Sequence, residues 1–331
     1  MSSASTSCSS TGVSLRRRCP ATLVLGLAWI ALCEVLLFTD VYLHSRGALR
    51  SDQAIIAYRQ NVPGTPLGQV ARWVAANMTP LVWVGYVMLL DGILALQRQG
   101  SPVRQRPHHF VLLSLASVFI WCVFDWVNFY YIRAWEYIGM PPEFFQRAWG
   151  YFISFAAIAP GMLMSGQVLL NQGWFDWARS ASWRMPRWAK WAALAAGAAM
   201  FIWPLVHPDP VTNLTLWASL VFLLDPINQK LGRPSMFRDW QNGWYGRTLA
   251  AFAGGLLCGF LWEFWNFWAL TKWTYHLPFL GASQGLRYFE MPVIGLLGFL
   301  PFGQEAWVMW QSMRIPLDGL AEPLPDEKTL L

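Results

Sequence analysis

Charged residues are scarce in this chain. Asp, Glu, Lys and Arg make up 13% of the 331 residues, whereas a soluble domain carries about 25%. This composition excludes a disordered or fibrous protein and a conventional cytosolic enzyme, because too little charge is present to cover a water-exposed surface. The net charge of +6 does not indicate a nucleic-acid partner, since basic cytoplasmic loops of a membrane protein give the same balance.

Residues that usually hold metals or cofactors are few or poorly placed. The five Cys form no CxxC pair, so neither a disulfide framework nor a zinc site is predicted. None of the five His lies in the middle of an apolar run, which argues against haem and di-iron sites. The P-loop, GxGxxG and GxSxG motifs are absent. We therefore expect no cofactor and no metal.

Long apolar runs are abundant. A run of about 20 apolar residues can span a bilayer as a helix. The chain has eight such runs, of which the sixth is the shortest, and they predict an all-α, polytopic integral membrane protein. The predicted spans are 20–43, 74–96, 109–132, 149–170, 188–206, 211–227, 247–270 and 288–311.

The basic residues between these runs predict the orientation of the chain. With the N-terminus inside, 16 of the 24 Lys and Arg residues fall on the cytoplasmic side. Cytoplasmic segments of membrane proteins carry an excess of Lys and Arg. We therefore expect both termini in the cytoplasm, and the cell membrane as the location if the source is bacterial.

The two halves of the sequence resemble each other. Leu89-Leu90-Asp91 is repeated as Leu223-Leu224-Asp225. A second motif has an acid, an Asn three residues later, and Trp-x-Tyr beginning seven residues after the Asn. Its two copies lie 138 residues apart and start at Asp125 and Glu263. Because each half holds four predicted spans, the repeats should share one orientation in the membrane and enclose a site at their interface.

This repeat predicts the domain organisation. A disordered cytoplasmic tail (1–19) precedes the first four-helix repeat (20–171). A cytoplasmic linker (172–187) leads to the second repeat (188–311), and a cytoplasmic tail (312–331) follows.

Acidic residues inside the apolar runs are the candidate catalytic groups. An acid in a membrane helix costs about 2.5–3.5 kcal/mol, so it is a functional candidate by default. Asp125 with Asn128, and Glu263 with Asn266, share a helix face, and we expect each amide to orient its acid. Glu290 opens the last run at a similar depth. We expect Glu263 to lie close to Glu290 or Asp125, so that one buried carboxyl keeps its proton and acts as a general acid.

A purely structural role is the alternative for these acids. Polar residues also hydrogen-bond helices to one another, at about 0.6–2 kcal/mol per contact. We weigh this reading more heavily for Glu34, Asp40, Asp91 and Asp225 than for the two repeated acids.

Aromatic residues gather around the acids. Their ring faces can stabilise a cation, although Trp residues also anchor membrane proteins at the interface. The candidate substrate-binding residues are Trp121, Trp135, Trp262, Trp265, Trp273, Tyr137 and Tyr275.

The acid followed by Trp-x-Tyr resembles the membrane-bound lycopene cyclase domains of bacteria and fungi. The Trp262-Glu263 segment is also similar to the small integral-membrane terpene cyclases of fungal meroterpenoid pathways. Glu290 falls near the place of the family's Pro-x-Glu-Glu motif, although the paired Glu is absent here. The resemblance implies an isomerase or lyase of terpenoid or carotenoid biosynthesis that protonates and cyclises an isoprenoid without a redox cofactor.

Three functions fit the sequence. The first is this acid-initiated cyclisation or isomerisation of a lipophilic small molecule dissolved in the lipid bilayer. The second is a transporter or permease with the intramembrane acids as coupling sites, since parallel repeats also occur in transporters. The third is a lipid-binding scaffold. The oligomeric state is left open.

Overall fold

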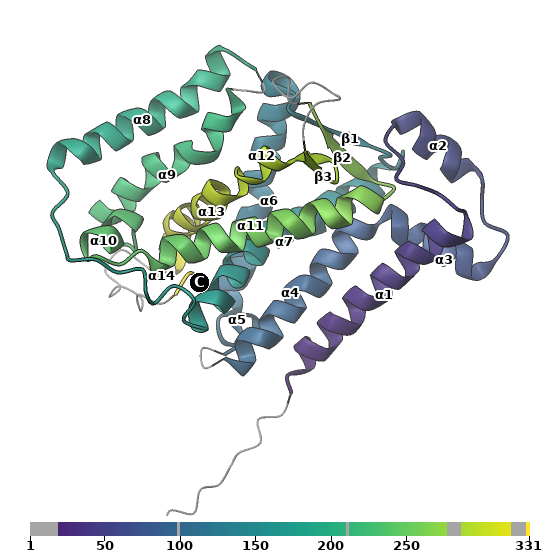
Figure 1. Ribbon diagram of the computed structural model, residues 1–331, viewed down its shortest axis with the longest axis horizontal. Coiled ribbons are helices and arrows are strands. Elements are labelled where there is room, and N and C mark those ends of the chain that lie inside the picture. Colours follow the sequence, from purple (N-terminus) through teal and green to yellow (C-terminus); the bar gives the residue numbers. More distant parts are fainter. Residues whose placement is uncertain (1–18, 98–99, 210–211, 277–285, 319–328) are drawn as a thin grey trace, which may run out of the picture.

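The computed structural model describes residues 19–97, 100–209, 212–276, 286–318 and 329–331, and consists mainly of long helices (Figure 1). Seven helices in the described part of the chain are long and apolar enough to cross a membrane. Many of their large apolar side chains point outward, a surface that suits lipid and not water. The protein is therefore an all-α, multi-pass membrane protein.

The helices follow the predicted runs with short elements between them. The first half contains α1 (Ala21–Leu43), α2 (Asp52–Gln60), α3 (Pro66–Ala76), α4 (Met78–Leu96), α5 (Pro102–Gln105), α6 (Pro107–Val127), the π-helical turn η1 (Asn128–Ile132), β1 (Trp135–Ile138) and α7 (Phe144–Asn171). The second half contains α8 (Arg187–Val206), α9 (Asn213–Lys230), α10 (Met236–Gln241), α11 (Gly246–Trp268), β2 (Lys272–Tyr275), β3 (Arg287–Tyr288), β4 (Met291–Pro292), α12 (Val293–Leu296), α13 (Phe299–Met313) and α14 (Ile315–Asp318).

The same order of helix packing recurs in the two halves. In the first half α1 packs on α4, α4 on α7, and α6 on α7. In the second half α8 packs on α9, α9 on α13, and α11 on α13. Contact between α7 and α11 joins the halves, and α1 and α8 lie at opposite edges of the molecule (Figure 1). The molecule is thus built from two parallel four-helix repeats.

Glycines at matching places let the peripheral helix of each half approach its neighbour. A Cβ on Gly26 of α1 would lie 2.4 Å from the backbone nitrogen of Leu89, and one on Gly197 of α8 would lie 2.8 Å from that of Leu223. Leu89 and Leu223 occupy the same position of the repeated Leu-Leu-Asp motif. Real Cβ atoms essentially never come this close, so each contact requires the glycine.

The acids of the Leu-Leu-Asp motif fix the short helices that follow. Asp91 accepts hydrogen bonds from Ser101 Oγ (2.6 Å) and the Val103 backbone nitrogen (3.2 Å). Asp225 accepts the equivalent bonds from Ser235 Oγ (2.8 Å) and the Phe237 backbone nitrogen (2.9 Å). Ser101 and Ser235 are the N-caps of α5 and α10. Both acids therefore have a structural role.

The last predicted run, 288–311, is not one helix. Residues 287–292 form the β3–β4 hairpin, and α12 and α13 follow as separate helices. Glu290 therefore lies in the turn of the hairpin and does not open a helix. Phe289 has a left-handed backbone (φ 55°), and Pro292 cannot donate the hydrogen bond of a continuing helix. Average hydropathy over the run does not detect such a break.

Two other expectations need adjustment. The sixth run forms α9, but α9 is not among the seven candidate spans, because its last turn is polar. Residues 312–318 complete α13 and form α14, so the predicted tail from 312 begins in helix. The predicted tail residues 1–18 and 319–328 lie outside the described residues, and with them the basic residues Arg16, Arg17, Arg18 and Lys328, as does Arg98.

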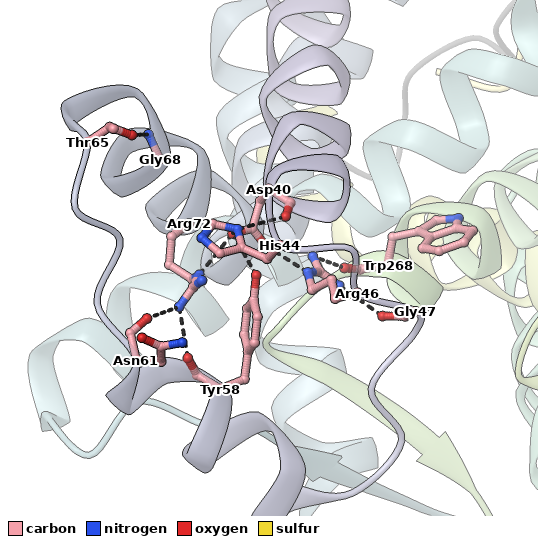
Figure 2. A network of polar contacts seen from close by, with 10 residues as sticks. All are labelled: Asp40, His44, Arg46, Gly47, Tyr58, Asn61, Thr65, Gly68, Arg72 and Trp268. Carbon is pink, nitrogen blue, oxygen red and sulfur yellow. Dashed lines mark hydrogen bonds and ion pairs between the residues drawn. The ribbon is translucent and has the colours of Figure 1, made fainter.

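A buried ion cluster ties α1, α2 and α3 to the end of α11 (Figure 2). Asp40 is fully buried and accepts hydrogen bonds from Arg46 Nε (2.7 Å), Arg72 Nε (2.8 Å) and the Tyr58 hydroxyl (3.0 Å). Arg46 also donates to the carbonyl of Trp268 (3.0 Å). Burial and the neighbouring Asp40 raise the pKa of Tyr58 to about 12, so its hydroxyl remains a donor. Asp40 therefore has a structural role, which is the role that we expect for it from the sequence.

Asp40→Ala should destabilise the protein strongly. The substitution leaves two buried guanidinium groups without a carboxylate, and breaking a buried pair in this way costs about 3–5 kcal/mol. The matched control is Glu136→Ala, whose ion pair with His276 is more than half exposed and contributes less than about 1 kcal/mol. Unfolding in detergent micelles measures both, and equal losses would contradict the role of Asp40.

Candidate functional site

The two Trp-x-Tyr motifs pair with each other. They form β1 and β2, an antiparallel ribbon in which Trp135 faces Tyr275 and Tyr137 faces Trp273. Between these pairs Glu136 faces Thr274, its own counterpart in the repeat. The register is therefore symmetric about this central pair, and the ribbon lies where the two halves meet.

Each repeated Asn holds the backbone of the ribbon. Asn128 accepts from the backbone nitrogens of Ala134 (2.8 Å) and Trp135 (3.2 Å) and donates to the Trp135 carbonyl (2.8 Å). Asn266 accepts from the backbone nitrogen of Trp273 (3.0 Å) and donates to its carbonyl (2.9 Å). The expectation that each amide orients the neighbouring acid is wrong, because the returning strand satisfies donor and acceptor of the amide.

The acids instead bind the side chains of the ribbon. Asp125 accepts from Trp135 Nε1 (3.1 Å) and from the Tyr137 hydroxyl, which lies 3.1 and 3.2 Å from its two oxygens. Glu263 accepts from the Tyr275 hydroxyl at 2.6 Å. Each half thus contributes one acid–tyrosine pair, held by the same element.

The two pairs differ in how far the acid is satisfied. Both oxygens of Asp125 accept hydrogen bonds. Glu263 is fully buried, and its Oε2 has no hydrogen-bond partner in the described structure. Trp273 Nε1 donates to the oxygen of Tyr275 (2.7 Å), whereas Trp135 donates to the acid itself. Of the two acids, Glu263 is the one whose second oxygen is left without a donor, and a protonated carboxyl suits such a site better than a charged one.

The tyrosines keep their protons at neutral pH. Burial raises the pKa of Tyr275 well above its ordinary value. Burial, with Asp125 nearby, raises the pKa of Tyr137 in the same way. Both phenols are therefore neutral hydroxyls that can donate a hydrogen bond or pass a proton on.

An aromatic pocket adjoins the ribbon. We call it the aromatic pocket. Both halves contribute to its wall, and neither acid is part of it. The two tyrosines thus stand between the acids and the space. The lining residues are Trp121, Ala134, Trp135, Tyr137, Trp217, Trp262, Trp273, Tyr275, Met291, Gly295, Gly298, Phe299 and Phe302.

A second pocket shares part of this wall. We call it the polar pocket, because Arg147, Lys272 and several hydroxyl and amide side chains line it. It lies against α4 and α7. The residues common to both pockets are Trp121, Tyr137, Trp262 and Trp273.

Glu290 does not form a carboxyl pair with Glu263. Its carboxylate lies 2.8 Å from Lys272 Nζ and 3.6 Å from Arg50 Nε. Lys272 is buried, and burial lowers its pKa while the hydrogen bond to Glu290 opposes this change. The expected proton sharing between the two glutamates is therefore wrong, because Glu290 has a cation of its own.

Trp265 is the one predicted aromatic residue outside both pockets. Its Nε1 donates to Glu34 (3.0 Å), and its ring packs edge-on against Trp83 and Tyr86.

Sequence reasoning missed Trp217 and Lys272. Trp217 belongs to α9, away from the repeated motif, although its position in an apolar run was visible. Lys272 directly precedes Trp273, and that adjacency was a usable signal.

Metal ligation has no obvious place in this site. Within the described ranges no three His, Cys, Asp or Glu side chains are grouped so that they could hold a metal ion. The chemistry available to the pockets is that of carboxyls, phenols, indoles and two cations.

Asn266→Ala should loosen the ribbon. It leaves the buried nitrogen and carbonyl of Trp273 without partners, which costs about 1–3 kcal/mol for each group. Hydrogen exchange should accelerate in residues 272–275 and 135–138. Asn242→Ala, at an exposed position, is the control. Unchanged exchange in both strands would show that the amide does not hold the ribbon.

The site thus combines two acid–tyrosine pairs with an apolar, aromatic space between the repeats. No protein-family model, no curated protein and no solved structure matches this chain. The contacts of the pocket are therefore the basis on which a function is assigned.

Proposed function

We propose that the protein is a membrane enzyme that protonates an isoprenoid and cyclises or isomerises it. The observation that carries this proposal is Tyr275, a residue that lines the aromatic pocket and whose hydroxyl donates a hydrogen bond to the buried carboxyl of Glu263. A proton source therefore faces a space that suits a hydrocarbon chain. The lining is almost entirely aromatic or aliphatic, as is typical of sites for apolar ligands.

The proton passes from Glu263 through Tyr275. For the transfer, the Tyr275 hydroxyl turns its hydrogen from Glu263 to one carbon of a substrate double bond, and the protonated carboxyl gives its own hydrogen to the phenol oxygen. The 2.6 Å separation of the two oxygens suits this transfer. Trp273 Nε1 donates to the same phenol oxygen and stabilises the electron density left there as the proton leaves.

Ring closure follows without any oxidant. The second carbon of the protonated double bond becomes a cation, and a further double bond of the chain attacks it to form the new carbon–carbon bond. Loss of a proton from a neighbouring carbon then restores a double bond, so substrate and product have the same mass. Tyr137 and Asp125 accept this proton, because Asp125 has the donors to hold negative charge. Its return to Glu263 resets the enzyme.

The aromatic wall favours the cationic intermediate. Trp121, Trp262 and Trp273 line the same space as Tyr275, and a ring face stabilises a nearby cation by about 0.5–2 kcal/mol. The same wall is apolar and offers little hydration to water, which would otherwise trap the cation as an alcohol.

A transporter is the second candidate, because the break between the β3–β4 hairpin and α13 lines the aromatic pocket at Gly295 and Gly298. Interrupted helices are frequent at the substrate sites of transporters. Uptake of a labelled lipid into proteoliposomes without change of its structure would favour transport. Binding with neither uptake nor conversion would favour a lipid-binding scaffold.

We also propose that both termini lie in the cytoplasm, with the ribbon near the opposite face of the membrane. The support is the 16 of 24 basic residues on the cytoplasmic segments. A reporter fused after residue 331 should be active only in its cytoplasmic form. Activity of a reporter that requires export would reverse this orientation.

Glu263→Gln should abolish product formation while leaving folding and membrane insertion intact. The amide has the same shape and can still bond Tyr275, but it has no acidic proton to give. The protein is incubated with polyprenyl substrates, and chromatography with mass spectrometry detects a product whose mass equals that of the substrate.

Two comparisons sharpen this experiment. Tyr275→Phe should also lose activity, since it interrupts the relay, whereas Glu136→Gln on the exposed side of the ribbon should retain it. Full activity of the Glu263→Gln protein would contradict the assignment of the proton donor.

A further inference from the structure

We infer that the substrate is an amphiphile, an isoprenoid chain with an anionic oxygen head group, and that the head binds in the polar pocket beside Arg147. This inference rests on the proposed function, since it names the class of molecule that the same site accepts. The proposed reaction fits both hydrocarbon carotenoids and prenyl lipids that carry a head group. The inference selects the second class of substrate.

The two pockets differ in the side chains that they offer. In the described part of its wall, the aromatic pocket offers as polar side-chain groups the indole nitrogens of its tryptophans and the hydroxyls of Tyr137 and Tyr275. The polar pocket is lined by Thr79, Gln146, Arg147, Tyr151, Ser154 and Lys272, among others. Most of these groups are hydrogen-bond donors, so they match a ligand rich in acceptor oxygens.

One hydroxyl group in this pocket makes no hydrogen bond to the described residues. Thr79 Oγ1 is a buried atom that has no hydrogen-bond partner among the described residues. A buried hydroxyl without a partner costs free energy that a ligand oxygen can recover. Thr79 lies at the start of α4 and is one of the residues that line the pocket.

The charge of the pocket is also unbalanced. Lys272 is neutralised by Glu290 at 2.8 Å. Arg147 donates only to the carbonyls of Pro141 (2.8 Å) and Pro142 (2.6 Å), and no ion pair of the described residues includes it. Among the residues that the structure describes, no Asp or Glu lines the pocket. The lining thus carries a positive charge that a carboxylate or a phosphate would complement.

The wall that the two pockets share lets one substrate molecule place its head group in the polar pocket and its isoprenoid chain in the aromatic pocket. Tyr137 and Trp273 belong to both pockets, and Trp273 also bonds the oxygen of Tyr275. A chain whose head lies at Arg147 can pass these residues and fold in the aromatic pocket next to Tyr275. Arg147 lies near the start of α7 and is partly exposed, as a site for an interfacial head group should be.

Binding of labelled prenyl lipids to the purified full-length protein tests this inference. The probes are geranylgeranic acid, geranylgeranyl phosphate, the neutral alcohol geranylgeraniol and a linear terpene hydrocarbon of the same length. The acid and the phosphate should bind at least about tenfold more tightly than the alcohol, as expected for a charge-assisted hydrogen bond. The ratio between the two anions identifies the head group.

Arg147→Gln should weaken binding of the anions by about tenfold and change binding of the alcohol by less than about twofold. Arg147→Lys keeps the charge without the fork that holds the two proline carbonyls, so it should retain most of the anion preference. It thereby separates loss of charge from loss of local structure. Thr79→Val, which is nearly isosteric, should weaken the anions and the alcohol but not the hydrocarbon.

Equal affinity for hydrocarbon and anion, or an anion preference that survives Arg147→Gln, would overturn the inference. The proposed function can fail separately. If the Arg147-dependent anion preference is found, and no prenyl probe is converted by the wild-type protein, the binding site stands and the cyclisation does not. If the hydrocarbon alone is bound and converted, the cyclisation stands and the head-group site does not.

Discussion

The antiparallel pairing of β1 with β2 is the contact on which the rest of the site depends. Asn128 and Asn266 each hold a tryptophan backbone of this ribbon, and the ribbon in turn places Tyr137 and Tyr275 against their acids. A short two-stranded ribbon is marginal alone. Here the buried amides of Asn128 and Asn266 bond the backbone of the ribbon. The same contacts therefore stabilise the ribbon and position the two tyrosines beside their acids.

Symmetry of the repeats explains why the pocket has two acid–tyrosine pairs, and departures from symmetry explain how they can act differently. In the first half Trp135 donates to Asp125, and in the second half Trp273 donates to Tyr275. One indole thus supports a carboxylate, and the other supports the oxygen of the phenol that loses a proton in the proposed reaction. Two groups that begin as equivalents can in this way become acid and base.

Much of the architecture could be predicted from the sequence. The repeated Leu-Leu-Asp and acid–Asn motifs identified equivalent helices, and their acids do lie at equivalent contacts. The function of Asn266 was not predictable from its spacing. The spacing of three residues places Asn266 on the same helix face as Glu263. Its partner, however, is the Trp273 backbone, which reaches that face only after the chain has turned back.

Other features were hidden for different physical reasons. The break after Glu290 depends on a single left-handed residue, Phe289, which hydropathy averages away. The pairing of Glu290 with Lys272 joins residues 18 positions apart through a hairpin whose existence the sequence pattern did not indicate. The polar pocket is assembled from α4, α7 and the ribbon, so no single motif contains it.

Deuterium labelling tests the central claim, that a protein acid starts the reaction by giving a proton to carbon. The Glu263 and Tyr275 protons exchange with solvent, so the reaction in heavy water should add one deuterium to a carbon of each newly formed ring, while recovered substrate stays unlabelled. A product that forms in heavy water without carbon-bound deuterium would contradict the account, because its reaction would not begin with proton transfer from these groups.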